Sequence, residues 1–392
     1  MAKLTVKNVG PIQEAELEVK KHTVFIGPQG TGKSTLAKLI AIGLDGDIIQ
    51  GADINQAILE KYTIHTYTND NSSFTFTTDT HAIIYDHSKL EFTYQDQQDQ
   101  PVFSESTFRS FLNDVRNSKP SVREVFVESL ADRKLFEELL TKFVIEKKIF
   151  SITSSYIPAE RTLLATLNEA IWSLIYSNID FPKSITSFAK HFEQARNAID
   201  RLNIKFLDIH YAYMQGYDRL IQTGTKFVLL SQSASGYQSI IPLLLVVEHQ
   251  RQQSQHRFII EEPELNLYPT AQKDLIYSLI SGLDPNVTYQ DAEWVITTHS
   301  PYVLSSFNTL MLAYKVAQRS DELRAEVEKI IPSRCWINPD EFAAYYVDGG
   351  TVRSIISEKT GLIADNELDD VSDDLADEQD KLFALSRSVP RT

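Results

Sequence analysis

The sequence GPQGTGKST, residues Gly27–Thr35, follows an apolar run at Thr23–Ile26 and precedes a helix-like run at Leu36–Ile42. Its glycines allow the backbone to curl so that successive N–H groups point toward an anion. The helix that follows directs the positive end of its dipole toward the same point. The pattern G-x-x-x-x-G-K-[ST] between a strand and a helix predicts a loop that binds the phosphates of a nucleotide.

The residues of this phosphate loop suggest how the nucleotide is held. Lys33 is expected to reach the outer phosphates, and the hydroxyl group of Ser34 is expected to bind Mg²⁺. The backbone turns at Gly27, Gly30 and Gly32, which we expect to lie against the phosphates. A nucleotide and Mg²⁺ are therefore the predicted ligands.

The composition is that of an ordinary globular protein. The chain has 392 residues, of which 42% are apolar, enough to fill the cores of two or three domains. No run approaches the roughly 18 apolar residues of a membrane span, and the start MAKLTVKNVG lacks the apolar segment of a secretion signal. We therefore expect a cytoplasmic protein that does not bind a membrane. The single cysteine, Cys335, is expected to be a small buried side chain.

The formal net charge of -15 argues against a broad electrostatic grip on nucleic acid. The segment Asp365–Asp380 holds nine acids and no base, so the rest of the chain is only mildly acidic and a local basic face is still allowed. Leu368, Val371 and Leu375 recur within this segment at helical spacing. The pattern predicts an acidic helix at 363–385, either with a solvated acidic face or with a docking surface for a basic partner.

A second motif places two adjacent carboxylates after an apolar strand. The run Arg257–Ile260 is followed by EEPELNLYP, residues Glu261–Pro269. Ligands of open α/β sheets bind at the carboxyl ends of such strands. Glu261 is expected beside Mg²⁺, and Glu262 is expected to polarise the water that attacks the terminal phosphate. A shift of one acid, with Glu264 taking part, is the alternative.

A third motif, WVITTHSP at Trp294–Pro301, is a second apolar strand that ends in His299. The imidazole of His299 is positioned to hydrogen-bond the terminal phosphate or the attacking water, and thus to report whether that phosphate is present.

A small polar turn, Ser-Ala-Ser-Gly, opens an apolar helix in the segment Ser231–Glu248. A helix N-terminus with free N–H groups is another anion site. Two such sites in one subunit are redundant for one nucleotide. They are both useful if each subunit offers its second site, at Ser235 and Gly236, to the nucleotide held by another subunit.

The spacing of apolar residues divides the rest of the chain into a head and two insertions. Short strands around Leu4–Val6 and Ala15–Val19 lead into the phosphate loop and predict the first half of a nucleotide-binding sheet. Segments 1–45 and 219–392 are expected to form the nucleotide-binding head. Alternating residues predict a β-rich insertion at 46–103, and helical spacing predicts a mainly helical insertion at 104–218 with one strand-like break at Phe150–Ile157.

The order of these motifs resembles that of the ABC-type ATPases. The similarity is strongest to the soluble branch that contains the OLD-family and RecF-like proteins and the ATPase subunits of bacterial anti-phage defence systems. It covers residues 1–45 and about 219–310, and in the middle only YIPAER at Tyr156–Arg161, to which we assign no role. The resemblance implies an α/β P-loop NTPase with a mixed central sheet, a small antiparallel β insertion and a helical insertion.

The resemblance also implies roles for single residues. ATP and Mg²⁺ would be bound by Lys33, Ser34 and Thr35, with Glu261 as the Walker B acid. Glu262 would be the catalytic base, His299 the switch histidine, and Ser235 and Gly236 the signature contacted in trans. Two residues depart from the family pattern, Gln29 in place of Asn and Tyr268 in place of His, and the family's glutamine loop has no clear counterpart.

OLD-family proteins carry a Toprim nuclease domain after the ATPase, and this chain is expected to lack one. The segment Tyr345–Ile355 resembles a Toprim opening but lacks its glutamate, and no later strand ends in Asp-x-Asp. A nuclease partner would therefore be a separate chain.

The resemblance implies a homodimer or larger homo-oligomer whose shared nucleotide sites make it a sensor and regulator of a separate effector, a nuclease or toxin in phage defence. The alternative is a RecF-like ATPase that clamps DNA in maintenance or repair. A membrane transporter subunit is less consistent with the long segment between the phosphate loop and the signature.

Overall fold

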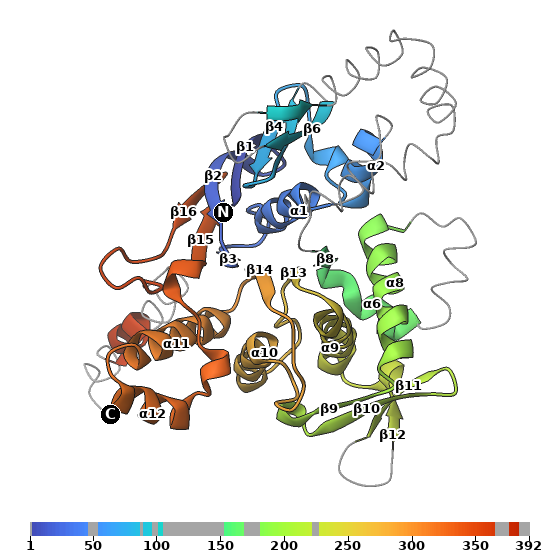
Figure 1. The fold of residues 1–392 in the computed structure, drawn as a ribbon, viewed down its shortest axis with the longest axis vertical. Coiled ribbons are helices and arrows are strands. Elements are labelled where there is room, and N and C mark those ends of the chain that lie inside the picture. Colours follow the sequence, from blue (N-terminus) through green and yellow to red (C-terminus); the bar gives the residue numbers. More distant parts are fainter. Residues whose placement is uncertain are drawn as a thin grey trace, which may run out of the picture.

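The computed structural model describes residues 2–45, 54–86, 89–95, 101–104, 153–167, 181–221, 227–364 and 376–383. A six-stranded mixed sheet holds the phosphate loop near its middle (Figure 1). Its order is β16 (Thr351–Ser354), β15 (Phe342–Asp348), β3 (His22–Ile26), β14 (Ala292–Thr298), β13 (His256–Glu261) and β8 (Thr153–Ile157). All neighbours are parallel except β15 and β16. This arrangement confirms the predicted α/β fold with a mixed central sheet.

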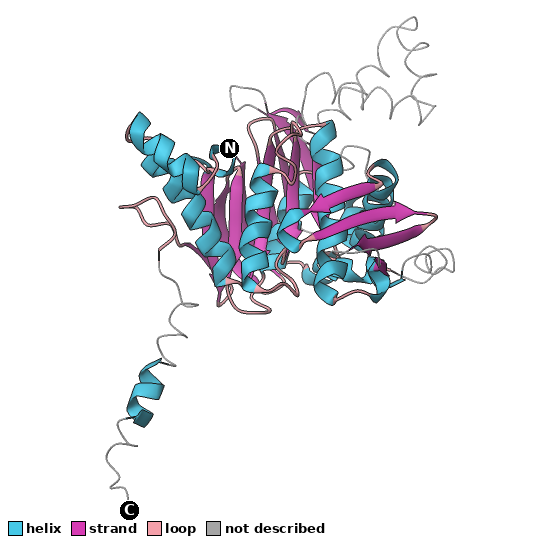
Figure 2. Ribbon diagram, turned by 90° about the horizontal axis from the view of Figure 1, so that it is seen from below, coloured by secondary structure: helices cyan, strands magenta, loops and turns pink. Residues whose placement is uncertain are grey.

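Helices cover both faces of the central sheet. Helix α1 (Lys33–Gly43) lies on one face, and α9 (Ser235–Gln253), α10 (Pro269–Ser281) and α11 (Pro301–Ala317) lie on the other (Figure 1). Viewed from below, the helices of the face that carries α9, α10 and α11 form a layer across the strands (Figure 2). Because both faces are covered, the strands are continuous apolar runs, as parallel sheets require.

Three further helices pack around this layer. Helices α6 (Thr162–Leu167) and α8 (Lys183–Ala198) contact α9, and α12 (Asp321–Ile330) contacts α11. A short helix, α2 (Ile54–Lys61), lies beside α8. Among the described residues, no helix is both long and apolar enough to cross a membrane.

A second, antiparallel sheet lies over α1. Its order is β2 (Ile12–Val19), β1 (Ala2–Val9), β4 (Ser73–Thr77), β5 (His81–Asp86), β6 (Lys89–Gln95) and β7 (Pro101–Ser104). Leu36 and Ile40 of α1 share one core with Phe74 and Phe76 of β4 and with Val295 of the central sheet.

This pairing corrects two expectations. Strands β1 and β2 do not belong to the nucleotide-binding sheet, because β1 pairs with β2 and β4 instead of with β3. The boundary expected at residue 46 does not separate two sheets, since β1 and β4 are hydrogen-bonded neighbours. Strands β1, β2, β4, β5, β6 and β7 together form one β layer.

The segment expected to be mainly helical, 104–218, contains more strand than its pattern indicated. Residues 105–152 lie outside the described residues. Strand β8 is an edge strand of the central sheet, so the core resumes at residue 153. Strands β9 (Arg201–Ile204), β10 (Ile209–Met214), β11 (Tyr217–Ile221) and β12 (Phe227–Leu229) form a four-stranded antiparallel sheet. The strands are short, and Ile209 and Tyr211 alternate toward the core, which the helical interpretation missed.

The C-terminal part of the head completes the central sheet. The sequence that resembles a Toprim opening forms the hairpin of β15 and β16, next to the phosphate-loop strand. Cys335 is buried and free. Residues 376–383 are helical and exposed (Figure 2). The acidic helix expected at 363–385 does not begin at residue 363, because Ile363 forms an isolated β-bridge with Ile356. Leu368, Val371 and Leu375 lie outside the described residues, so a helix there stays a prediction.

Candidate functional site

The phosphate loop connects β3 to α1, as its sequence predicts. Gly27 has a φ of 146°, and a Cβ atom added there would lie 2.2 Å from the carbonyl oxygen of Val347 on β15. Gly32 has a φ of 108°, and a Cβ atom there would lie 2.5 Å from Cδ1 of Ile12. No larger residue fits either backbone conformation, so both glycines are required by close approach as well as by the turn.

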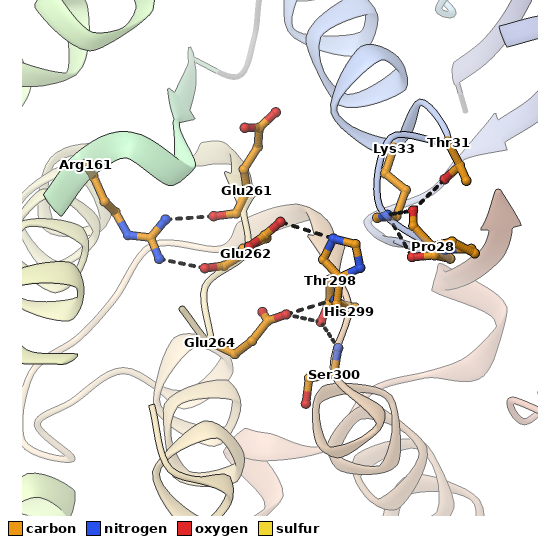
Figure 3. Close-up of polar contacts among 11 residues, drawn as sticks. Pro28, Thr31, Lys33, Arg161, Glu261, Glu262, Glu264, Thr298, His299 and Ser300 are labelled. Atoms are coloured by element: carbon orange, nitrogen blue, oxygen red, sulfur yellow. Dashed lines mark hydrogen bonds and ion pairs between the residues drawn. The ribbon is translucent and has the colours of Figure 1, made fainter. Parts of the chain in front are cut away.

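Lys33 is buried at the start of α1 and folds back over its own loop (Figure 3). Its Nζ atom donates hydrogen bonds to the carbonyl oxygens of Gly27, at 2.8 Å, and Pro28, at 2.6 Å. Burial lowers the pKa of Lys33 to about 8, against the opposing attraction of Glu262 and Glu264. An anion that enters the loop would compete with these carbonyl groups for the ammonium group.

Glu261, the last residue of β13, lies beneath α1. Its side chain is buried, and its Oε1 atom has no hydrogen-bond partner. Burial raises the pKa of this carboxyl group, while Lys38, Tyr156 and Ser34 act in the opposite direction. A buried carboxylate oxygen without a partner, close to the exposed hydroxyl of Ser34, fits a divalent cation.

No cluster of three or more His, Cys, Asp or Glu side chains suited to a metal was found in the part of the chain that the structure describes. Mg²⁺ is commonly held by one or two protein groups together with substrate phosphates and water. The pair Ser34 and Glu261 is consistent with that kind of site and not with an all-protein metal cage.

Glu262 and His299 follow the ends of the neighbouring parallel strands β13 and β14, and their side chains point toward one another (Figure 3). The Nε2 atom of His299 lies 3.2 Å from Oε1 of Glu262. The hydrogen bond to His299 is the main cause that lowers the pKa of Glu262, and Lys33 and Arg161 add to it. Glu262 is therefore an ionised carboxylate at neutral pH.

Glu264 has a different environment from the two preceding acids. It is buried, and its Oε1 atom accepts hydrogen bonds from Oγ1 of Thr298, at 2.6 Å, and from the backbone N–H of His299, at 3.0 Å. Glu264 thus fixes the end of β14 that carries His299. These contacts give it a supporting place beneath the pair of Glu262 and His299, and the Oε2 atom has no partner.

Ser235 and Gly236, the predicted signature residues, begin α9. Ser235 is exposed, and no hydrogen bond joins it to the phosphate loop among the described residues. A Cβ atom added to Gly236 would lie 2.8 Å from the carbonyl oxygen of Asn266, in the loop after Glu264. The first turn of α9 therefore packs closely against this acidic loop and leaves its outer face open.

Arg161 was not identified as a site residue from the sequence. Its side chain is fully buried, and its Nη1 and Nη2 atoms donate to the carbonyl oxygens of Glu261 and Glu262, both at 2.7 Å (Figure 3). Its only sequence signal was its place at the end of YIPAER, directly after the strand-like segment. The partners of its side chain are main-chain carbonyl groups, which a sequence motif does not reveal.

Comparisons with known proteins agree with these motifs. A family model described as the AAA ATPase domain matches residues 1–304. No curated protein matches the chain.

Solved structures similar to this one include two SMC heads. One is an SMC head bound to the C-winged helix domain of ScpA, 9% identical, with 92% of this chain and 99% of that chain covered and a TM-score of 0.44. The other is the SMC head domain from Thermotoga maritima, 10% identical, with 91% and 98% covered and a TM-score of 0.36.

Proposed function

Since the chain belongs to the AAA ATPase domain family and is an ATPase, we propose that its catalytic site is formed by the phosphate loop, Glu262 and His299. The observation that carries this proposal is the pair of Glu262 and His299, held at 3.2 Å at the carboxyl ends of adjacent parallel strands. Ligands of α/β sheets bind at this edge, which is also the edge where β3 enters the phosphate loop.

The arrangement assigns chemistry to each side chain. The carboxylate of Glu262 orients a water molecule and accepts its proton as that water attacks the terminal phosphate of ATP. His299 donates to Glu262 before the substrate binds, and it is placed to hydrogen-bond the terminal phosphate afterwards. Lys33 leaves the carbonyl oxygens of its loop and neutralises charge on the outer phosphates.

Ser34 and Glu261 are the groups that would hold Mg²⁺, as the buried oxygen of Glu261 without a partner suggests. When bound, the ion neutralises negative charge on the phosphate oxygens. Glu261 itself keeps its carboxylate directed away from bulk water.

We further propose that the site is completed by a second copy of the chain. The start of α9 is exposed and makes no hydrogen bond to the phosphate loop of its own subunit among the described residues, so its free N–H groups are open to a nucleotide held by another copy. ATP then binds best to the closed assembly, and by linkage its presence favours closure.

The resemblance to the soluble branch of ABC-type ATPases supports a cytosolic regulator whose nucleotide state is read by a separate effector. A nuclease or toxin of a phage-defence system is the effector class that this resemblance favours. The effector would bind one state of the assembly more tightly than the other, since only a difference in affinity lets the two equilibria affect each other.

The test is ATP hydrolysis by the purified chain with Mg²⁺, with chelator, and by Lys33→Ala. Turnover that requires Mg²⁺ and disappears in Lys33→Ala is expected, and normal turnover by that variant would contradict the site. The same assay with duplex DNA at several salt concentrations distinguishes control of a protein effector from the alternative, a DNA-clamping ATPase. Strong stimulation with a steep salt dependence indicates a DNA clamp, and no stimulation leaves control of a protein effector.

A further inference from the structure

Arg161 links two parts of the site that lie far apart in the sequence. It is in the turn between β8 and α6, with 0% of its side chain exposed. Besides its two bonds to the acidic strand end, its Nε atom donates to the carbonyl oxygen of Ser239 on α9, at 3.1 Å. Its Nη1 atom also donates to Pro158, at 3.1 Å. All four partners are main-chain carbonyl oxygens.

A buried guanidinium group with only carbonyl partners is an unusual way to gain stability. Burial lowers the pKa of Arg161 to about 10, with Glu264, Glu262 and Glu261 acting in the opposite direction, so the group is charged at neutral pH. Buried charges add little net stability even when they are well paired. The main effect of Arg161 is therefore on the geometry of the carbonyl groups that it binds.

One of these carbonyl groups belongs to Glu262, whose backbone has a φ of 42°. A residue other than glycine is strained in this left-handed region and stays there only when its surroundings hold it. The carbonyl oxygen of Glu262 accepts hydrogen bonds from Arg161 and from the backbone N–H of Leu265, at 3.1 Å. The backbone N–H of Glu262 donates to the carbonyl oxygen of Thr297, at 2.9 Å. Losing the bond to Arg161 frees one side of this carbonyl and lets the side chain of Glu262 turn away from His299.

The other end of the link is the first part of α9. Ser239 lies one turn after Ser235, and Pro242 inside the helix has no N–H to donate to the carbonyl group of Gln238. The start of α9 thus has fewer helical hydrogen bonds than an uninterrupted helix, and Arg161 binds it there. The close approach of Gly236 to the acidic loop is a second contact between the same two parts.

We propose that Arg161 is a positioning residue that transmits the position of the first turn of α9 to Glu262 in the same subunit. This inference rests on the proposed function, in which that turn engages the nucleotide held by a second copy. Engagement of Ser235 and Gly236 at one nucleotide then sets the orientation of Glu262 at the other. The two sites of an assembly are coupled through four hydrogen bonds of one side chain.

The test compares Arg161→Lys with a matched control, Arg251→Lys. Arg251 is also buried and donates to main-chain carbonyl groups, those of Leu279 at 2.7 Å and Ile280 at 3.3 Å. However, it lies near the C-terminal end of α9, and both of these carbonyl groups belong to α10. One ammonium group cannot replace the separate bonds of the guanidinium fork. Arg161→Lys should lower kcat roughly 10- to 100-fold, because misplacing a catalytic group by about 1 Å has this effect.

ATP affinity of Arg161→Lys should stay within about threefold of wild type, since none of the four hydrogen bonds of Arg161 described above ends in the phosphate loop. Arg251→Lys should shift the midpoint of thermal unfolding while keeping kcat within a similar factor. If Arg161→Lys does not fold, Arg161→Gln offers a second variant that keeps one donor group. Normal kcat in a folded Arg161 variant, or an equal loss in both arginine variants, overturns the proposal.

A second arm repeats Arg161→Lys in the Glu262→Gln background. If Arg161 acts through Glu262, the residual turnover of Glu262→Gln should not fall further, because the group being positioned is already inactive. The same fold-loss in both backgrounds would mean a general structural role and would overturn the proposal. Failure of the proposed function has a different signature, which is wild-type protein without Mg²⁺-dependent turnover or Lys33→Ala with normal ATP affinity.

Discussion

The Nε2 atom of His299 and the Oε1 atom of Glu262 lie 3.2 Å apart, although the two residues follow different strands. The contact exists because β13 and β14 are parallel neighbours whose carboxyl ends meet at one edge of the sheet. Glu264 fixes the His299 side of the pair through the backbone N–H of His299, at 3.0 Å, and Arg161 fixes the Glu262 side. The pair is held from both sides before any nucleotide binds.

Replacing Glu262 by Gln should lower kcat by about 10² to 10⁴, because an amide cannot accept the proton of the attacking water. ATP binding should persist, and the ATP-bound assembly should accumulate because hydrolysis no longer releases it. Measurement of turnover, together with light scattering of the protein with and without ATP, checks both effects. A variant that hydrolyses ATP at the wild-type rate is incompatible with Glu262 as the base.

Removing the His299 side chain should change the pH dependence of the reaction. The hydrogen bond from His299 lowers the pKa of Glu262, so Glu262 stays ionised to a lower pH than a free carboxylate. In His299→Ala this pKa rises, and the acid limb of the kcat/KM profile should move to higher pH. His299→Gln retains a donor and should shift less, while protonation of ATP itself affects all three proteins equally. An unchanged acid limb in His299→Ala would show that the pair does not set the charge of Glu262.

ATP binding should take up a proton under mildly alkaline conditions. Lys33 has a pKa lowered to about 8 in the free protein, so it is partly neutral above that pH, and bound phosphates favour its charged form. Affinity for ATP should therefore fall by up to about tenfold per pH unit above pH 8. Calorimetry in two buffers of different ionisation enthalpy measures the proton uptake. A dissociation constant that is the same at neutral and alkaline pH contradicts this prediction.

Gly236→Ala should separate α9 from the acidic loop. The added methyl group would lie 2.8 Å from the carbonyl oxygen of Asn266, too close for an ordinary contact. The expected cost in the free energy of unfolding is about 1 to 3 kcal/mol, and turnover should fall because the start of α9 moves. Ser235→Ala is the control for stability alone, since Ser235 is exposed and its change leaves the packing intact. Equal stability of Gly236→Ala and wild type would mean that the close approach is not required.

The sequence was most informative where a motif joined a strand to a helix. The phosphate loop, the acidic motif and the His299 strand each combine an apolar run with polar residues at its end, and parallel pairing then brings those ends together. The α/β fold and the ATPase class are confirmed on this basis. The roles of the site residues stay predictions, although the structure brings Glu262 and His299 into contact.

Two features were not predictable from pattern alone. Two residues separate strand β2 from β3, yet β1 and β2 belong to the sheet of β4 and not to that of β3. Their alternating faces pack on α1, a tertiary preference that adjacency in sequence conceals. Arg161 was missed because its partners are carbonyl oxygens, which every residue carries. A sequence motif therefore does not show which residues Arg161 binds.

The most direct test of the shared nucleotide site mixes Ser235→Arg subunits with Lys33→Ala subunits, each inactive alone. In a mixed dimer, the intact phosphate loop of the Ser235→Arg subunit can meet the intact Ser235 and Gly236 of its partner. Random mixing should restore at most roughly a quarter of wild-type turnover, because half of the dimers are mixed and each holds one complete site. The value should fall below a quarter if Arg161 couples the sites, since Glu262 of the complete site belongs to the subunit with the altered α9 start. Turnover that stays at the level of the separate variants, while both proteins are folded and associate, would contradict a site shared between subunits.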